Sequence, residues 1–111
     1  MAEIIIDGCL IEQDPEGYLR QMSDWNRAVA EQLALQEGIE LTQAHWEILD
    51  VLRGFYQQFE ASPAMRPLVK AVAQKLGAEK GKSIYLMSLF PGSPAKLASK
   101  IAGLPKPTNC L

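Results

Sequence analysis

Apolar and polar residues follow two different patterns along the chain, and the pattern changes near residue 14. Residues 3–12 hold two apolar, β-branched runs on either side of Asp7-Gly8. Asp-Gly is a favoured two-residue loop between antiparallel strands because both positions tolerate positive φ angles. The segment therefore predicts a β-hairpin, and since a lone hairpin is barely stable in water, we expect it to pack on the rest of the chain.

After the hairpin, apolar residues recur three and four positions apart, which is the spacing of helices that bury one face. A capping residue followed by proline marks several helix starts, as in Asp14-Pro15 and Ser62-Pro63. The stretch 43–60, with Thr42 as its cap, is expected to be the central core helix. Pro67 lies early in the next helix and either distorts that turn or marks where the regular helix begins. The expected helical stretches are 15–25, 26–37, 43–60, 63–76, 84–90 and 94–103.

The chain ends in a segment of a different kind, 104–111, which reads LPKPTNCL. Its two prolines are incompatible with a regular helix and favour an extended, polyproline-II-like backbone. At roughly 3.1 Å per residue, the seven steps from Gly103 to Cys110 span about 20 Å. We expect one α+β, mostly helical domain over 1–103, with the hairpin packed on an array of about five short helices, and an extended, flexible C-terminal arm over 104–111.

Composition restricts the class of protein. The 111 residues suit one domain, and 48% hydrophobic with 22% charged residues is the ordinary mixture of a folded soluble protein. No apolar run approaches the roughly 18 residues of a membrane span, and the start of the chain lacks the features of a signal peptide. Two cysteines are too few for a disulfide scaffold, so we expect a reducing cytoplasm and no membrane association.

The net charge of −2 hides an uneven distribution of charged residues. Residues 1–60 hold twelve acids and three bases, whereas residues 61–111 hold one acid, Glu79, and eight bases. The basic half can meet an acidic protein or a nucleic acid, or it can pair with the acidic half across the fold. Short helices with a break at Ser62-Pro63 also leave open a helix-turn-helix module that binds DNA.

Cys110 is the strongest candidate for chemistry. A thiol on an extended arm suits a group-transfer reaction in a partner's active site, although it can also be an incidental cysteine in a disordered tail. Cys9 follows the hairpin turn and is expected to pack as a small hydrophobe. His45 is expected to be a packed or surface histidine rather than a catalytic base. No metal-ligand spacing or phosphate-binding loop is present, so we expect no metal, no cofactor and no self-contained pocket enzyme.

Several motifs resemble the TusE/DsrC family of sulfur-relay proteins, and the resemblance covers most of the chain. Only the start and the 20–38 region fit loosely. The motifs are GYL at Gly17–Leu19, LTQAHWEIL at Leu41–Leu49, FYQQFEASPAMRPLVKA at Phe55–Ala71, EKGKSIYLMSLFPGSPAKLASKIAG at Glu79–Gly103 and KIAGLPKPTNC at Lys100–Cys110.

The resemblance implies a sulfurtransferase that carries sulfur as a persulfide on the penultimate cysteine, which is Cys110 here. In the dissimilatory sulfite-reductase branch, a second arm cysteine lies eleven residues before the first. Serine occupies that position here, at Ser99, so the corresponding arm disulfide cannot form. Cys9 does not match that family position. The single-cysteine arm therefore resembles the branch that thiolates tRNA.

The same resemblance implies the partners. They are a TusBCD-like sulfur donor complex and an MnmA-like tRNA 2-thiouridylase with its bound tRNA, which modifies the wobble uridine. A DsrC-like role in sulfite reduction or sulfur oxidation is the alternative. Because no acid follows Glu79, we also expect Lys96, Lys100 and Lys106 to help dock the arm to acidic partner surfaces or to tRNA-bearing complexes.

Overall fold

The computed structural model describes residues 2–6 and 8–107. Strand β1 (Ala2–Ile6) pairs antiparallel with β2 (Cys9–Gln13), and the register places Ile6 opposite Cys9. Two residues therefore form the loop, as the Asp-Gly pair predicts, and Gly8 has a φ of 79°. The predicted hairpin is confirmed, while Asp7 itself lies outside the described residues.

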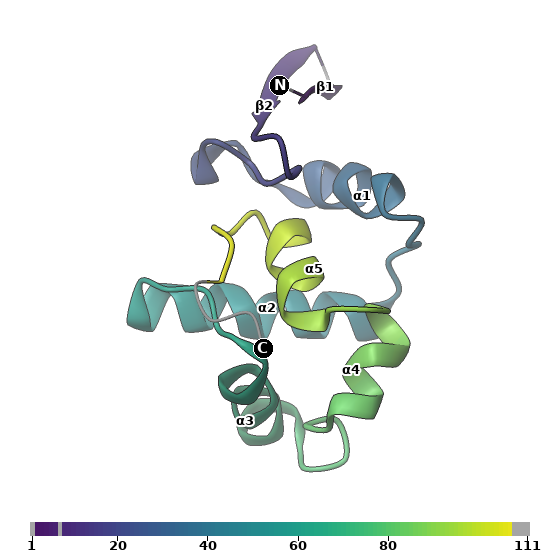
Figure 1. The fold of residues 1–111 in the computed structure, drawn as a ribbon, viewed down its shortest axis with the longest axis vertical. Coiled ribbons are helices and arrows are strands. Elements are labelled where there is room, and N and C mark those ends of the chain that lie inside the picture. Colours follow the sequence, from purple (N-terminus) through teal and green to yellow (C-terminus); the bar gives the residue numbers. More distant parts are fainter. Residues whose placement is uncertain (1, 7, 108–111) are drawn as a thin grey trace.

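The hairpin projects from one end of the molecule and touches the body through one face (Figure 1). Ile11 and Gln13 are buried, and the Gln13 and Gln36 side-chain amides exchange hydrogen bonds of 3.0 and 3.2 Å. The expectation that Cys9 packs as a small hydrophobe is wrong, because its side chain is exposed. Cys9 lies next to the turn, and burial along β2 begins only at Ile11.

The expected helix over 15–25 is wrong. The Asp14 side chain accepts hydrogen bonds from the backbone N–H groups of Glu16 and Tyr18, at 2.9 and 3.0 Å. Gly17 adopts a φ of 93°, which reverses the chain, and Leu19 then forms an isolated antiparallel bridge to Gln13. Asp14 thus stabilises a turn instead of starting a helix. Only a short 3₁₀ segment, Met22–Asp24, is helical in this region.

Five α-helices follow, and Figure 1 shows α1 beneath the hairpin, α3 and α4 at the opposite end, and α5 between them. Helix α5 packs against each of the other four helices, and α2 is the longest helix. The mostly helical α+β fold class is confirmed. None of the helices in the described part of the chain is long and apolar enough to cross a membrane. The helices are α1 (Arg27–Gln36), α2 (Gln43–Phe59), α3 (Met65–Leu76), α4 (Ser83–Leu89) and α5 (Pro94–Ile101).

Local sequence explains some of the helix starts but not all of them. The Asn26 side chain accepts a hydrogen bond of 2.9 Å from the Val29 N–H and caps α1. Ser62 does not cap α3 as the sequence pattern predicts, because Ala64 occupies the N-cap position. Pro67 lies in the first turn of α3, where a missing N–H costs nothing, so the regular helix begins near it.

His45 is a packed histidine at the start of α2. Its Nδ1 accepts a hydrogen bond of 3.0 Å from the Thr42 backbone N–H, so the proton belongs on Nε2, which donates to the Leu89 carbonyl at 2.9 Å. The ring also meets Phe90 edge-on, with 5.2 Å between the ring centroids. One side chain thereby caps α2 and ties it to the end of α4.

We expect His45→Ala to lower the free energy of unfolding by about 2–4 kcal/mol, because it leaves buried polar groups unpaired and removes the contact with Phe90. Urea denaturation followed by circular dichroism measures this change. Gln43→Ala, at an exposed position two residues earlier, is the control and should cost less than about 0.5 kcal/mol. Equal losses in the two variants would contradict the bridging role of His45.

Candidate functional site at the base of the C-terminal arm

The arm leaves the domain through a defined turn at the end of α5. The Gly103 N–H donates to the Lys100 carbonyl at 3.1 Å, and the Leu104 N–H donates to the Ser99 carbonyl at 2.9 Å. This pair of bonds is the Schellman motif, in which the residue after the helix adopts a positive φ. Gly103 has a φ of 74°. The direction of the arm at its start is therefore set by the helix end.

Two side chains from distant parts of the sequence hold the carbonyls that the end of α5 leaves free. Trp25 Nε1 donates to the Ile101 carbonyl at 2.8 Å, and Arg53 Nη1 donates to the Ala102 carbonyl at 2.6 Å. The last carbonyls of a helix lack partners within the helix and carry a partial negative charge. A guanidinium at this position therefore stabilises the helix end electrostatically as well as through its hydrogen bond.

Arg53 and Trp25 also stack on each other. The Arg53 Cζ atom lies 3.9 Å from the centroid of the Trp25 ring. Burial lowers the pKa of Arg53, and the nearby Asp50 carboxylate acts in the opposite direction. Since the guanidinium remains charged at any physiological pH, the stack is a cation–π contact with restricted water access. The two donors to the end of α5 are therefore also in contact with each other.

The next residues of the arm lie on the body of the domain. We call residues 101–106 the arm base. Leu104 is 1% exposed, the Ser62 hydroxyl donates to the Pro105 carbonyl, and Lys106 Nζ lies 2.9 Å from a Glu16 carboxylate oxygen. Ser62, predicted as a helix cap, thus contacts the arm instead. Cys110 lies outside the described residues, so its role stays a prediction.

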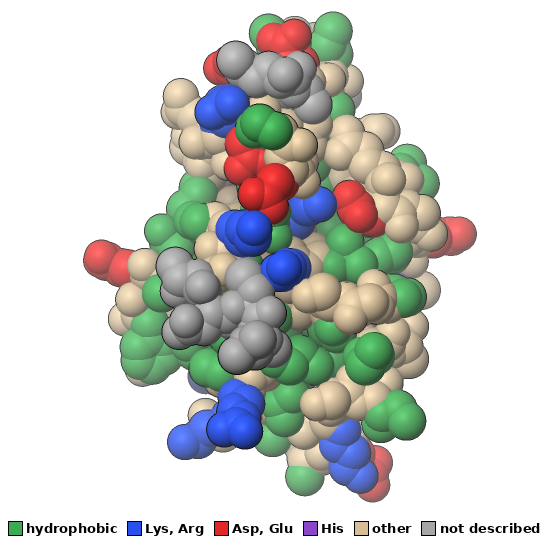
Figure 2. All heavy atoms as spheres, in the orientation of Figure 1, with side chains coloured by type: hydrophobic (Ala, Val, Ile, Leu, Met, Phe, Trp, Pro, Cys, Tyr) green, Lys and Arg blue, Asp and Glu red, His purple; other side chains and the backbone are tan. Residues whose placement is uncertain are grey.

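The structure partly explains why the first half of the chain is acidic and the second half basic. Each ion pair formed within the described part of the chain joins the acidic half to the basic half. On the face shown in Figure 2, acidic side chains gather mainly toward the hairpin end and basic ones toward the middle and the opposite end. The pairs are Glu47–Lys80 at 2.8 Å, Glu37–Lys100 at 3.3 Å and Glu16–Lys106 at 2.9 Å.

Two of the three lysines expected to dock the arm on partners therefore have partners within the chain. Lys100 pairs with Glu37, and its Nζ also lies 5.3 Å from the centroid of the Tyr18 ring. Lys106 pairs with Glu16, and of the three only Lys96 forms no ion pair with a described residue. Ion pairs with the acidic half thus neutralise part of the positive charge of the basic half.

Ser99 occupies a fully buried position on α5, and its hydroxyl has no hydrogen-bond partner among the described atoms. Its backbone carbonyl is the acceptor for Leu104 in the helix-ending turn. Cys9 and His45 make none of the arm-base contacts described above. Within residues 2–6 and 8–107, no group of three or more His, Cys, Asp or Glu side chains is arranged to hold a metal ion.

Sequence reasoning missed Trp25, Arg53 and Glu16 as arm-base residues. Their contacts span 76, 49 and 90 positions along the chain. A glycine followed by an apolar residue after a helix is a readable sign of the Schellman motif, so Gly103-Leu104 held a signal for the turn. The sequence contains no comparable signal for the side chains that hydrogen-bond to this turn.

The fold and the arm base define a class of protein: a small helical domain that presents a segment containing a cysteine beyond its last helix. The family described as DsrC like protein matches residues 5–111. A sulfurtransferase TusE from Yersinia pseudotuberculosis is 57% identical over 105 residues, covering 95% of this chain and 97% of the relative. A sulfurtransferase TusE from Photorhabdus laumondii is 55% identical over 111 residues and the full length of both chains.

Solved structures of the same family have the same fold. The NMR structure of Allochromatium vinosum DsrC has a TM-score of 0.90 and 50% identity, with 98% of this chain and 97% of that chain covered. The crystal structure of oxidized DsrC, the γ-subunit of dissimilatory sulfite reductase from Archaeoglobus fulgidus, has a TM-score of 0.86 and 36% identity. It covers 99% of this chain and 100% of that chain. The chain belongs to the DsrC-like family, and like its relatives named TusE it is a sulfurtransferase.

Proposed function

We propose that Cys110 accepts sulfur as a persulfide and relays it toward the 2-thiolation of a tRNA wobble uridine. The observation that carries this proposal is the identity of 55–57% over nearly the whole chain to relatives named sulfurtransferase TusE, together with a cysteine in the arm. The donor is a TusBCD-like complex, and the acceptor is an MnmA-like tRNA 2-thiouridylase that holds the tRNA. The proposed location is the cytoplasm.

The transfer needs no outside oxidant or reductant. The Cys110 thiolate attacks the terminal sulfur of a donor persulfide, the donor S–S bond breaks, and a new S–S bond forms on Cys110. The donor leaves as a thiolate, and one proton is returned to it from solvent. The acceptor then repeats the step by attacking the terminal sulfur on Cys110, which regenerates the Cys110 thiolate.

The geometry of the arm base supports delivery of the thiol to a partner. Residues 1–103 would form the domain and 104–111 the mobile arm that carries Cys110. In the described state, Leu104 is buried and the Pro105 carbonyl and Lys106 each have a partner on the body. Movement of the whole arm therefore requires at least the exposure of Leu104 and Pro107, loss of the hydrogen bonds made by the Leu104 N–H and the Pro105 carbonyl, and loss of the exposed Lys106–Glu16 ion pair. The contacts that a partner makes with the arm would have to offset this cost.

The alternative role in sulfite reduction or sulfur oxidation has one structural observation behind it, the similarity to DsrC structures. Ser99 argues against the form of that role that needs an arm disulfide, because its hydroxyl cannot replace a thiol. The DNA-binding alternative has less support, since three of the eight bases in the second half are paired within the chain.

Mass spectrometry tests the proposed function directly. The full chain is incubated with a cysteine desulfurase, cysteine and the donor complex, alkylated, and digested with trypsin. Because Lys106 precedes proline, the expected modified peptide begins at Ile101 and contains Cys110 as its single cysteine. We expect one added sulfur on this peptide. Added sulfur on the peptide that contains Cys9, with none on the Cys110 peptide, contradicts the proposal.

A further inference from the structure

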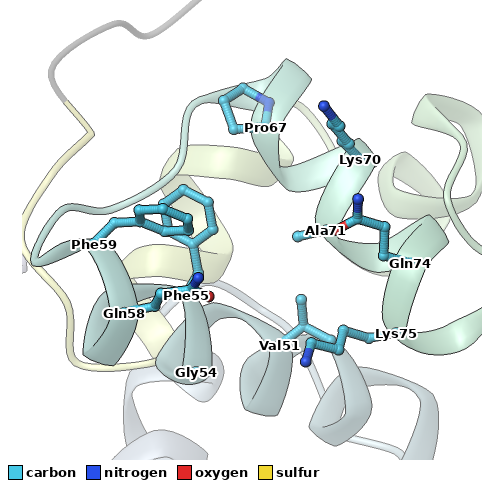
Figure 3. A pocket seen from close by; sticks show the side chains of 10 residues that line it. All are labelled: Val51, Gly54, Phe55, Gln58, Phe59, Pro67, Lys70, Ala71, Gln74 and Lys75. Atoms are coloured by element: carbon cyan, nitrogen blue, oxygen red, sulfur yellow. The ribbon is translucent and has the colours of Figure 1, made fainter.

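A groove between α2 and α3 lies apart from the arm-base contacts and has no role in the proposed sulfur chemistry. It has a volume of about 350 Å³. Figure 3 shows Val51, Gly54 and the Phe55–Phe59 pair along α2, facing Pro67 and Ala71 on α3. Phe59 is 56% exposed although it is a large aromatic residue. An exposed aromatic ring in a hollow between two helices is typical of a binding surface.

The α3 wall of the groove is basic. Lys70 and Lys75 line it, and Arg66 lies one turn before Lys70 on the same helix. None of the three forms an ion pair with any residue in the described part of the chain, in contrast to Lys80, Lys100 and Lys106. Residues 61–78 contain no acid. The helix thus presents basic side chains without ion pairs beside a hollow with both apolar and polar lining, and Glu47 and Asp50 lie in the adjoining hollow near Lys75.

We propose that the groove between α2 and α3 docks an acidic, amphipathic helix of a partner protein, which inserts a large apolar side chain beside Phe55 and Phe59. The groove lies where α2 meets α3, and a partner helix can place apolar side chains in it at intervals of three and four residues (Figure 3). Carboxylates on that helix then lie against Lys70 and Lys75, which steers the encounter and fixes the orientation.

The shape of the groove favours a protein over a nucleic acid. A nucleobase stacks best on a flat, open aromatic face. Here the Phe55 and Phe59 rings are tilted by 46° with centroids 4.6 Å apart, so they fill one end of the hollow and offer no flat platform. This arrangement favours contact with an apolar side chain over stacking of a base.

Gly54 provides a variant that fills the groove. A Cβ atom added at Gly54 meets no other atom within 4 Å, and the residue is not at positive φ. Because glycine is a poor helix former and leucine a good one, Gly54→Leu should keep or raise the stability of α2. Its side chain would occupy the space that the partner needs.

The test uses ¹⁵N-labelled full chain and a synthetic helical peptide with glutamates on one face and leucine and tryptophan on the other. We expect amide shifts confined to α2 and α3 and a Kd that rises with salt. Gly54→Leu should weaken binding at least about tenfold, and Lys70→Gln with Lys75→Gln several-fold with a flatter salt dependence. Lys82→Gln, outside the groove, is the matched control and should bind like the parent chain.

Several results would overturn the inference. One is amide shifts outside the groove, or none at all. Another is that the same peptide with lysine in place of glutamate binds as tightly as the acidic peptide. A third is that a single-stranded RNA binds more tightly than the acidic peptide. A dimer of the chain that Gly54→Leu dissociates would instead assign the groove to a second copy. Melting temperatures that are no lower than that of the parent chain exclude misfolding as the cause of lost binding. None of these readouts depends on sulfur transfer by Cys110.

Discussion

A chain carrying Cys110→Ser should pass no sulfur from the donor complex to the tRNA-modifying enzyme, with 2-thiouridine falling to the level found without the chain. A serine hydroxyl cannot form a persulfide, so the loss removes the chemistry rather than weakening it. The measurement is the 2-thiouridine content of tRNA after incubation with desulfurase, cysteine, ATP and the purified relay partners.

Cys9→Ser is the matched control for this experiment. Cys9 is exposed on the hairpin and is therefore open to the same reagents as any surface thiol. We expect the Cys9→Ser chain to transfer sulfur at the rate of the parent chain. Normal transfer by Cys110→Ser, or loss of transfer in Cys9→Ser, would show that Cys110 is not the carrier. A melting curve of each variant checks that both remain folded.

Gly103→Ala should cause one of the largest losses of stability of any single methyl addition to this chain. An added Cβ would lie 2.4 Å from Trp25 Cδ1, well inside van der Waals contact. The residue also has a φ of 74°, where a side chain costs about 1–2 kcal/mol. Displacing the tryptophan adds an overpacking cost of about 1–3 kcal/mol. We expect a total loss of about 2–5 kcal/mol in chemical denaturation.

Gly38→Ala separates the two contributions. Gly38 has a φ of 73°, almost the same as Gly103, but a Cβ there meets nothing within 4 Å. Its loss of about 1–2 kcal/mol should measure the backbone cost alone. In a double-mutant cycle, Trp25→Ala should then reduce the effect of Gly103→Ala to the Gly38→Ala value. Equal losses for the two single alanine variants would mean that Trp25 does not constrain the arm base.

The hairpin and most helices were predictable because their signals are local. Gly8 adopts the positive φ that an Asp-Gly turn predicts, and Asn26 and Thr42 lie directly before the helices they start. The prediction of a helix over 15–25 was wrong because Asp, Pro and Gly also form turns. Asp14 accepts from Glu16 and Tyr18 in a turn, and the positive φ of Gly17 prevents the helix that Pro15 suggests.

The candidate site was only partly predictable. The prolines predicted that the helix gives way to a different backbone after Gly103, and residues 104–107 lie outside any helix, whereas the role of Cys110 stays a prediction. The contacts that hold the arm base were not, because Trp25 and Arg53 reach it from elements far away in the sequence. The position of Cys9 shows the opposite error. A general tendency of cysteine toward burial was applied to a residue at the tip of a projecting hairpin, where there is nothing to bury it.

The burial of Leu104 and Pro107 has a consequence for the local concentration of the thiol. A tether that pivots at Gly103 reaches about 20 Å to Cys110, whereas one that pivots at Pro107 has three steps and reaches about 9 Å. Because the accessible volume varies as the cube of the reach, the proposed role of Cys110 predicts that a pivot at Pro107 would raise the effective molarity of the thiol near the domain roughly tenfold. A partner held against the domain would meet the concentrated thiol, and a passing molecule farther away would not.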